Sequence, residues 1–286
     1  MKRYSEEMAA MLVEALPYIQ KYNKKIVVVK YGGNAMVNQD IKENVIKDIM
    51  LLYYCGLKPV LVHGGGPDIN AMMDKVGLEP KFVDGKRVTD EKTMEIVEMV
   101  LAGKTNSGIV SLINSMGGRA VGLSGKDASL INASVMNEKW GLVGKVDSIN
   151  PQIIFDLLDA EYIPVISSVA IGEEGESYNI NADHIAGEIA AALKAEKLIM
   201  MTDVDGLYRD FDDKDSLITR MDLKEAEDLI KSKVLKGGMI PKVEACVKAL
   251  KGDVKRTHII NGTVQHSMIM ELFTDGGIGT MIYKYD

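Results

Sequence analysis

Short apolar runs alternate along this chain with longer stretches in which apolar residues recur every three or four positions. Short runs bounded by glycine or proline are typical of buried strands, and the longer stretches are typical of amphipathic helices. Strands are predicted over residues 25–31, 59–63, 119–124, 129–135, 143–148, 163–167, 197–203, 256–261 and 280–282. Helices are predicted over residues 40–55, 67–76, 90–102, 105–116, 151–160, 183–193, 223–231, 241–251 and 265–273. This alternation predicts an α/β fold with a mostly parallel central sheet sandwiched by helices.

Residues 1–22 precede the first strand and are predicted to form a separate N-terminal helix. Its apolar face is made by Met8, Met11, Leu12, Ala15, Leu16 and Ile19. Pro17 is expected to kink or end this helix because proline cannot continue a helical hydrogen-bond ladder. The apolar face must be covered by the chain's own domain or by another subunit, and the sequence leaves both open.

Two of the predicted strands end in glycines. The strand over 59–63 is followed by Gly64, Gly65 and Gly66, and Pro67 then opens a helix. Backbone N–H groups at a helix start carry partial positive charge, and glycines allow an anion to approach them. The strand over 25–31 leads in the same way into a glycine pair, Gly32 and Gly33. Two such turns on neighbouring strands predict binding sites for two anionic reactants.

Composition excludes several classes of partner. With 34 Lys and Arg against 41 Asp and Glu, the net charge of -7 provides no basic surface for nucleic acid or an anionic membrane. The two cysteines are far apart and are predicted to be reduced thiols, and the four histidines lack metal-ligand spacing. Acidic residues interrupt the N-terminal apolar stretch, and no apolar run approaches the length of a membrane span. We therefore expect a cytoplasmic protein with no metal held by its own side chains.

Lys30 and Lys242 are the candidate catalytic cations. Lys30 precedes Gly32 and Gly33, and Lys242 follows Gly237 and Gly238 at another predicted helix start. Taken alone, a single lysine of this kind is more commonly a solvated side chain. Two ammonium groups approaching one transferring phosphoryl group would neutralise the charge on its oxygens. The P-loop pattern and the dinucleotide-binding GxGxxG pattern are both absent, which argues against a nicotinamide-dependent dehydrogenase.

Three further polar residues follow in the chain. Arg87 lies in a hairpin predicted over residues 81–89, and its planar fork suits a bidentate carboxylate contact. Asn179 can donate an amide hydrogen to the same small molecule or cap the next helix. Asp183 can orient the two lysines, bind magnesium, or stabilise a helix N-terminus. The residues alone leave these alternatives open.

Taken in their order along the chain, the glycine turns, the two lysines and these polar residues resemble the motifs of the amino acid kinase family. Within that family they resemble the branch that phosphorylates N-acetyl-L-glutamate for arginine biosynthesis. The resemblance covers essentially the whole chain. It is carried by the blocks at residues 29–33, 62–67, 85–90, 178–183, 202–206 and 237–242. The blocks Gly-Lys-Arg-Val-Thr and Asn-Ile-Asn-Ala-Asp are the most specific to that branch.

The resemblance implies ATP- and Mg²⁺-dependent phosphorylation of the side-chain carboxylate of N-acetyl-L-glutamate. By this comparison, Lys30 and Lys242 stabilise the transferring group and Asp183 holds both lysines. The substrate-binding residues would be Gly65 and Gly66 through backbone N–H, Arg87 for the α-carboxylate and Asn179 for the acetamido end. ATP would be bound by Gly32, Gly33, Thr202, Asp203, Asp205, Gly206, Tyr208, Gly237, Gly238 and Met239. No general base is needed, because a carboxylate nucleophile is already ionised at neutral pH.

The resemblance also implies domain organisation and regulation. An N-lobe over residues 23–175 would bind the acylamino acid and dimerise, and a C-lobe over residues 176–286 would bind ATP. The kinked N-terminal helix resembles that of arginine-inhibited hexamers, in which it interlaces dimers. Glu271 and the backbone near Gly279 would then hold L-arginine. A PII-type signalling protein stays an open partner.

Departures from the family pattern are modest. Lys236 stands where a small Ser or Thr usually precedes the glycine pair. Residues 167–170, at a strand end expected to face the site, also differ from the family pattern. Two alternatives are kept. One is another amino acid kinase, acting on an aminoadipate derivative, aspartate, carbamate or UMP. The other is a non-catalytic arginine sensor or partner-binding scaffold with the same fold.

Overall fold

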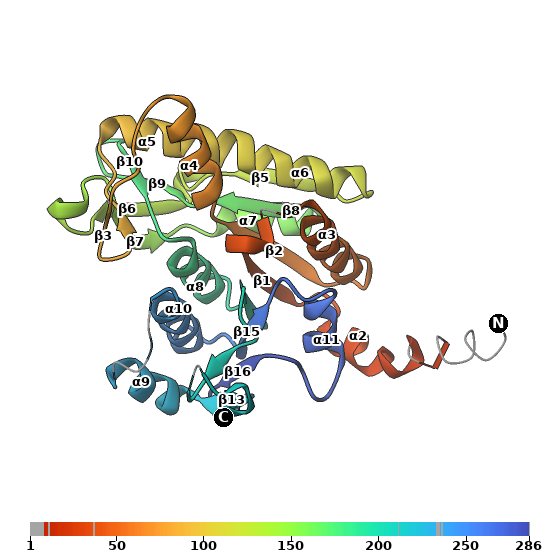
Figure 1. Ribbon diagram of the computed structural model, residues 1–286. Helices are drawn as coiled ribbons and strands as arrows, with labels where there is room; N and C mark the ends of the chain where they lie inside the picture. Colours follow the sequence, from red (N-terminus) through yellow and green to blue (C-terminus); the bar gives the residue numbers. More distant parts are fainter. Residues whose placement is uncertain are drawn as a thin grey trace.

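A central eight-stranded sheet organises the molecule (Figure 1). The structure, a computed structural model, describes residues 9–10, 12–36, 38–210, 212–232, 235 and 237–285. The strand order is β14-β16-β15-β11-β1-β2-β8-β5. The bounds are β1 Ile26–Tyr31, β2 Lys58–His63, β5 Ala120–Leu123, β8 Ile163–Ser167, β11 Lys197–Thr202, β14 Arg220–Asp222, β15 Arg256–Asn261 and β16 Thr280–Tyr283. Only the β15–β16 pair is antiparallel among these described strands, which confirms the mostly parallel α/β sheet.

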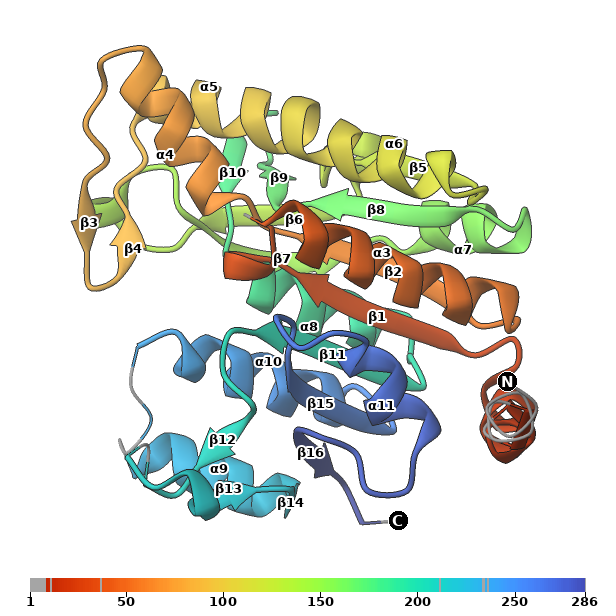
Figure 2. The same ribbon diagram turned by 45° about the vertical axis from the view of Figure 1, so that its right-hand side comes forward.

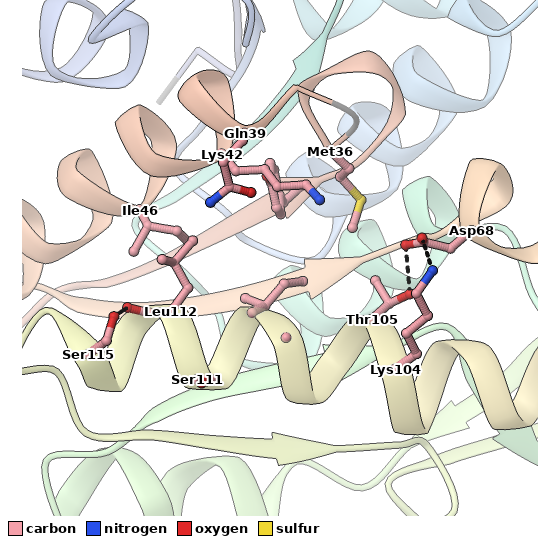
Figure 3. Close-up of a pocket in the computed structure, with 13 residues that line it drawn as sticks. Met36, Gln39, Lys42, Ile46, Asp68, Lys104, Thr105, Ser111, Leu112 and Ser115 are labelled. Carbon is pink, nitrogen blue, oxygen red and sulfur yellow. Dashed lines mark hydrogen bonds and ion pairs between the residues drawn. The ribbon is translucent and has the colours of Figure 1, made fainter.

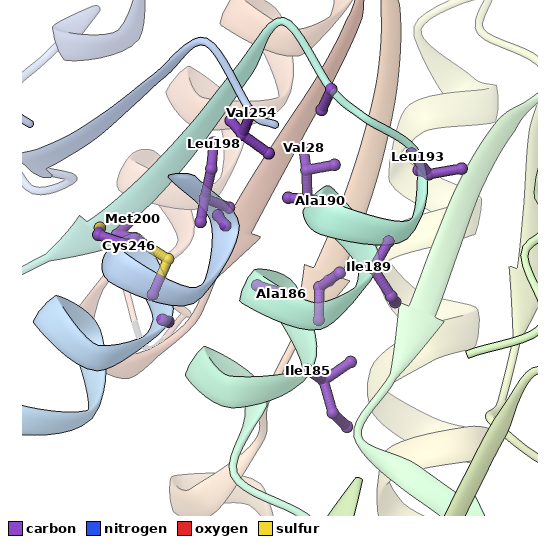
Figure 4. Close-up of a cluster of buried hydrophobic side chains, with 14 of the residues drawn as sticks. Val28, Ile185, Ala186, Ile189, Ala190, Leu193, Leu198, Met200, Cys246 and Val254 are labelled. Atoms are coloured by element: carbon purple, nitrogen blue, oxygen red, sulfur yellow. The ribbon is translucent and has the colours of Figure 1, made fainter. Parts of the chain in front are cut away.

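Helices cover both faces of this sheet (Figure 2). One face is covered by α3 (Gln39–Tyr54), α6 (Asn106–Ser115) and α11 (Ser267–Phe273). The other is covered by α7 (Gln152–Asp159), α8 (Ala182–Ala192), α9 (Leu223–Lys231) and α10 (Met239–Lys251). Successive strand side chains point to opposite faces. Val27 and Val29 therefore pack under α3, while Val28 packs against α8 beside Ala190 (Figure 4).

β1 lies at the centre, between the two halves of the chain. It pairs with β2 on one side and with β11 on the other, so one sheet continues across both expected lobes. Lys30 is opposite Val62 in register, and Tyr31 is opposite His63. Lys30 and His63 therefore lie on opposite faces of the sheet.

A second, four-stranded sheet was not predicted as a separate unit. Its order is β10-β9-β6-β7, with bounds β6 Ile131–Val135, β7 Gly144–Ile149, β9 Val169–Ile171 and β10 Ser177–Asn179. The predicted hairpin is confirmed as β3 (Phe82–Val83) and β4 (Lys86–Arg87). Asp84 and Gly85 have φ of 50° and 74°, as a tight Asp-Gly turn requires. A further two-stranded sheet pairs β12 (Leu207–Tyr208) with β13 (Leu217–Ile218).

The two helices predicted over 90–102 and 105–116 are in fact one continuous helix, so the predicted break is wrong. α5 (Glu91–Glu98) passes into α6 through a π-helical segment, Met99–Thr105. Gly103 lies inside this π-helical segment and does not end the helix. By length and composition, the helix over 91–115 could also cross a membrane, contrary to the expectation from the sequence. In this fold its apolar residues pack against α3, α4 (Gly66–Lys75) and the sheet.

The N-terminal helix is interrupted just before Pro17, as the sequence predicted. Residues 12–14 are helical, Ala15 is a turn, and α2 (Leu16–Tyr22) begins with Pro17 in its first turn. Leu12 is 68% exposed and Leu16 is 48% exposed, whereas Ile19 packs against the buried core under α3. The described part of the chain therefore covers the Ile19 end of this apolar face and leaves Leu12 and Leu16 exposed. Met8 and Met11 lie outside the described residues.

Candidate active site

Two helix starts meet at the carboxyl ends of the central strands. α4 begins directly after the glycine turn that follows β2. α8 begins after Asn181, whose side chain accepts hydrogen bonds from the backbone N–H groups of Asp183 (2.7 Å) and His184 (3.3 Å). A Cβ added to Gly64 would lie 3.5 Å from the Cβ of Ala182, so the glycine turn contacts the start of α8. Both helices therefore direct their N-termini toward one region.

Lys30, Asp183 and Lys242 meet in this region. One carboxylate oxygen of Asp183 lies 2.9 Å from Lys30 Nζ, and the other lies 2.8 Å from Lys242 Nζ. These side chains are 9%, 6% and 12% exposed, respectively. Lys30 comes from β1, Asp183 from the first turn of α8 and Lys242 from the first turn of α10. The carboxylate thus holds two ammonium groups side by side.

Burial and the ion pairs shift the pKa values of Lys30 and Asp183 in opposite directions. Burial lowers the pKa of Lys30 below its usual value, although the neighbouring Asp183 carboxylate opposes this shift. Burial alone would raise the pKa of Asp183, but Lys30 and Lys242 outweigh it and hold that pKa below its usual range. Asp183 is therefore ionised at neutral pH and keeps its counter-charge for both lysines.

Two adjoining cavities lie beside the lysines. The smaller, of about 210 Å³, is lined by Lys30, Gly32, Gly33, Met201, Thr202, Asp203, Val204, Gly238, Met239 and Lys242. The larger, of about 660 Å³, is lined by Val204, Gly206, Leu207, Tyr208, Arg209, Asp210, Asp212, Leu235, Gly237 and Met239. Val204 and Met239 line both. Lys30 and Lys242 make the smaller cavity basic, which suits an anionic ligand such as a phosphate.

Nine of the ten residues expected to bind ATP line these cavities, and Asp205 does not. Its carboxylate instead accepts hydrogen bonds from Asn261 Nδ2 and the Tyr208 hydroxyl, both at 2.8 Å. Asp205 therefore fixes the turn before β12. Gly206 is needed there because a Cβ would come within 2.5 Å of Thr280 Oγ1. Lys236, the departure from the family pattern, lies outside the described residues.

A divalent metal fits this site only together with a nucleotide. No group of three or more His, Cys, Asp or Glu side chains within the described ranges is placed to hold a metal ion. Asp203 is the only carboxylate among the described residues that line the smaller cavity. Mg²⁺ in kinase sites is held by substrate phosphates, waters and one or two carboxylates. These residues therefore fit a metal that arrives bound to phosphates.

The start of α4 is the candidate site for the second anion. Gly65 is its N-cap, and the first N–H groups of a helix have no partner within the helix. A Cβ at Gly65 would lie 2.6 Å from Leu101 Cδ2, so glycine lets the turn pack on the π-helical segment without displacing the Leu101 side chain. Asp68, in the first turn of α4, accepts hydrogen bonds from Lys104 Nζ (2.7 Å) and Thr105 Oγ1 (3.0 Å) and so anchors the start of the helix. These three residues line a cavity of about 430 Å³ on the sheet face that α3 and α6 cover (Figure 3).

Arg87 lies beside α4, as the hairpin predicted. It is 8% exposed and donates to Asn70 Oδ1 at 2.6 Å. Its other terminal nitrogen is 3.4 Å from Met73 Sδ, and the guanidinium carbon is 4.8 Å from the centre of the Phe82 ring. Because arginine carries five N–H donors, these contacts leave donors for a ligand carboxylate.

Asn179 is linked to the Arg87 strand through Thr89. Its amide nitrogen donates to Thr89 Oγ1 at 3.2 Å, and Thr89 Oγ1 donates to the Arg87 carbonyl at 3.1 Å. The cap of α8 is Asn181, so Asn179 is not the helix cap considered from the sequence. Asn179 therefore stays a candidate for ligand binding, two residues before that cap.

Glu271 and Gly279 are also brought together, but away from the lysine cluster. One oxygen of Glu271 accepts from the N–H groups of Ile278 (2.7 Å) and Gly279 (3.1 Å). The other lies 2.5 Å from His258 Nδ1, and His258 Nε2 is 2.9 Å from Lys197 Nζ. Burial lowers the pKa of His258 to about 4 and that of Lys197 to about 8. Lys197 also lies 5.1 Å from the Tyr22 ring centre, so this buried cluster contacts α2.

Some residues at the site were not singled out from the sequence. Asn181, the cap of α8, carries the usual sequence signal of a helix cap, an Asn before an apolar stretch. His63 and Asn106 are both buried behind the glycine turn, and their side chains lie 3.0 Å apart. No spacing in the sequence pairs them, because they meet only when the helix over 91–115 packs on the sheet.

Comparison with known proteins places this architecture among phosphotransferases. Residues 25–261 match the amino acid kinase family. An acetylglutamate kinase from Thermoanaerobacter pseudethanolicus is 53% identical over 287 residues, covering 99% of this chain and 96% of that protein. One from Heliobacterium modesticaldum is 54% identical over 290 residues, covering 97% and 98%.

A solved structure shares the fold. The N-acetylglutamate synthase from Neisseria gonorrhoeae, complexed with coenzyme A and N-acetyl-glutamate, superposes with a TM-score of 0.84 at 26% identity. The match covers 97% of this chain and 64% of that one, so part of the synthase lies outside the match.

Proposed function

This chain belongs to the amino acid kinase family, and we propose that it transfers the γ-phosphoryl group of ATP to the side-chain carboxylate of N-acetyl-L-glutamate. Kinases of this family use ATP with a metal ion, and we assign Mg²⁺ as that ion. The observation that carries the proposal is the Lys30–Asp183–Lys242 cluster beside the smaller cavity. Two relatives more than half identical over nearly their whole length are acetylglutamate kinases, which supports the choice of acceptor.

In the reaction, an oxygen of the substrate carboxylate attacks the γ-phosphorus, and the bond from phosphorus to the β-γ bridging oxygen breaks. ADP leaves with the electron pair of that bond, and the product is an acyl phosphate. Asp203 together with the substrate phosphates would hold Mg²⁺, which would further neutralise the phosphate charge. Lys30 and Lys242 neutralise the negative charge on the transferring group, and Asp183 keeps both ammonium groups in position. No side chain must remove a proton, because the acceptor is already ionised.

The acceptor would be held at the start of α4. The N–H groups of Gly65 and Gly66 would bind the reacting carboxylate, and Arg87 would bind the α-carboxylate through its remaining donors. Asn179 would donate to the acetamido oxygen. This division of roles requires an acetylated amino acid with two carboxylates, so free glutamate and aspartate should be poor substrates.

ATP would occupy the two adjoining cavities. The phosphates would lie in the smaller cavity near Gly32, Gly33 and Gly238, and the adenosine in the larger one beside Tyr208 and Met239. These nucleotide residues come mainly from residues 176–286, and the acceptor residues come mainly from residues 23–175. We therefore keep the two lobes as functional units that share one sheet.

We also propose that L-arginine inhibits the enzyme at the Glu271 cluster. The buried carboxylate there suits a guanidinium, and Lys197 is a buried ammonium that suits a carboxylate. The same cluster contacts Tyr22 of α2, and Leu12 and Leu16 before it are exposed. Association of dimers into a hexamer through residues 1–22 would cover that surface. A cytoplasmic location and a PII-type partner stay predictions.

The test is a substrate panel with ATP and Mg²⁺. ADP formation and hydroxylamine-trapped acyl phosphate are measured with N-acetyl-L-glutamate, glutamate, aspartate and N-acetyl-aminoadipate, each with and without L-arginine. We expect turnover restricted to N-acetyl-L-glutamate and suppressed by arginine. Turnover with a different acceptor would overturn the substrate assignment, and activity insensitive to arginine would overturn the effector site. ATP binding without turnover of any acceptor would favour the sensor alternative.

A further inference from the structure

The orientation of the Asn106 side chain determines which nitrogen of His63 carries the proton. Asn106 Nδ2 lies 2.8 Å from the Val165 carbonyl, 3.4 Å from the Leu123 carbonyl and 3.0 Å from His63 Nε2. Carbonyl oxygens only accept hydrogen bonds, so the amide atom facing them must be the donating nitrogen. The same NH₂ group therefore donates to His63 Nε2. A neutral imidazole that accepts at Nε2 carries its proton at Nδ1.

The Nδ1–H group in turn fixes the first peptide of the glycine turn. His63 Nδ1 lies 2.9 Å from the Gly64 carbonyl and donates to it. The described chain has no cis peptide bond, so the N–H of Gly65 points opposite to the Gly64 carbonyl. His63 and Lys30 lie on opposite faces of the sheet. The Gly65 N–H is therefore turned away from His63 and toward the face that carries Lys30.

We infer that His63, held by Asn106, is a positioning residue that aims the Gly65 N–H at the reacting carboxylate of the acceptor. This inference rests on the proposed function, in which that N–H binds the acceptor. A peptide plane next to glycine is otherwise free to rotate, because glycine has the widest range of backbone conformations. The His63 hydrogen bond removes this freedom before the acceptor arrives, as preorganised donors require.

Two observations show that the arrangement is built into the fold. His63 is fully buried, and burial lowers its pKa to about 4, so the ring stays neutral at neutral pH. A Cβ added to Gly122 would lie only 1.9 Å from Asn106 Oδ1. The absence of a side chain at Gly122 therefore provides the space that the Asn106 amide occupies.

The first test reads the tautomer directly in the wild-type enzyme. Long-range proton–nitrogen correlation spectra of ¹⁵N-histidine-labelled protein distinguish the two neutral tautomers, and H63Q identifies the signal among the four histidines. We expect the Nδ1–H form at neutral pH. The Nε2–H form or a charged ring would overturn the inference.

The second test compares two amides at position 63. H63N places an NH₂ group near the Nδ1 position and can still donate to Gly64, whereas H63Q reaches only the Nε2 position. We expect H63Q to raise the KM and Kd for N-acetyl-L-glutamate by about 10-fold to 100-fold, the usual range for a hydrogen bond to a charged group. The KM for MgATP should stay within about twofold, and H63N should recover most of the lost affinity.

Equal loss of affinity in H63N and H63Q, or no loss in either, would overturn the inference. G122A provides a second route, because it displaces Asn106 without changing either polar residue. It should likewise raise the KM for the acceptor and not that for MgATP, in protein whose melting temperature confirms folding. Wild-type enzyme that shows the Nδ1–H tautomer but does not bind N-acetyl-L-glutamate would refute the proposed function and leave the geometry intact.

Discussion

Replacement of Asp183 by asparagine tests the ion cluster most sharply. D183N keeps the shape of the side chain and removes the charge that lies 2.9 Å from Lys30 Nζ and 2.8 Å from Lys242 Nζ. The two ammonium groups then lose the carboxylate that holds both of them, and Asp203 acts only as a weaker counter-charge for Lys30. Burial already lowers the pKa of Lys30, so in D183N this lysine can lose its proton, which removes the repulsion between the two ammonium groups.

The expected effect can be worked out from these contacts. Two unit charges about 4 Å apart interact by about 4 kcal/mol at an effective dielectric constant of about 20. Removal of one partner from a buried ion pair typically costs about 3–5 kcal/mol of stability. Loss of one stabilising charge on the transferring phosphoryl group typically lowers kcat by about 10²-fold to 10³-fold. We expect D183N to show both effects, with little change in the KM for N-acetyl-L-glutamate.

The pH dependence has a defined sign. In the variant, the pKa of Lys30 falls further below that of a lysine in the unfolded chain. The unfolded chain then binds more protons than the folded one between these two pKa values, so the free energy of unfolding rises with pH across that window. Activity changes in the opposite direction, because the reaction needs Lys30 protonated. The kcat of D183N should therefore recover toward acidic pH, where wild-type kcat shows no such rise.

The assay is kcat from pH 6 to pH 9 together with urea unfolding of the same samples. D159N is the matched control, because Asp159 forms an exposed ion pair with Lys58 at the same 2.9 Å distance. Exposed pairs contribute about 0–1 kcal/mol, so D159N should leave kcat and stability unchanged. A D183N enzyme within threefold of wild-type kcat, or one whose loss of kcat is independent of pH, would refute the reasoning.

Four further outcomes are expected. R87K should raise the KM for N-acetyl-L-glutamate about 10-fold to 100-fold with a much smaller change in kcat, because lysine cannot form the bidentate contact; steady-state kinetics would show a kcat loss instead if Arg87 acted in catalysis. E271Q should raise the half-inhibitory concentration of L-arginine at least about 10-fold without changing the uninhibited rate, since a neutral amide loses the charge-assisted contact. Deletion of residues 1–22 should reduce the molar mass in light scattering from a hexamer to a dimer, and an unchanged mass would contradict the role of this helix. The free energy of unfolding should fall as pH drops from about 6.5 to about 4, because the folded-state pKa values of His63 and His258 are both about 4 and the unfolded chain binds protons at these two rings first. Unfolding of H63N, which lacks one of the two rings, should depend less on pH over this range.

The sequence predicted the central sheet well because its strands are short apolar runs with glycine or proline at their ends. It also predicted the Asp-Gly hairpin that carries Arg87, since positive φ at Asp84 and Gly85 has a strong local signal. It did not predict the continuous helix over 91–115. Gly103 resembles a helix end in sequence, but in the fold Val100 and Leu101 of the π-helical segment are buried together with Ile69 and Met73 of α4.

The site was partly predictable for a related reason. The glycine turns and the two lysines have local patterns, but their meeting on Asp183 depends on how β1, α8 and α10 align. The role of Asp205 in fixing a turn depends on Asn261, which comes from a distant strand. The His63–Asn106 contact depends on the absence of a side chain at Gly122 in a third element. Pairings of this kind follow from tertiary packing, which no local pattern in one sequence records.

The central claim is that a substrate carboxylate attacks the γ-phosphorus of ATP. The most direct measurement uses N-acetyl-L-glutamate with ¹⁸O in its side-chain carboxylate, in the presence of ATP, Mg²⁺ and hydroxylamine. Hydroxylamine attacks the acyl carbon of the product, and the carbon–oxygen bond breaks, so the bridging oxygen leaves with the phosphate. We predict inorganic phosphate that carries one ¹⁸O, released in equal amount to ADP and to the hydroxamate. Unlabelled phosphate released with ADP would show that water or another group accepts the phosphoryl group, and would contradict the account.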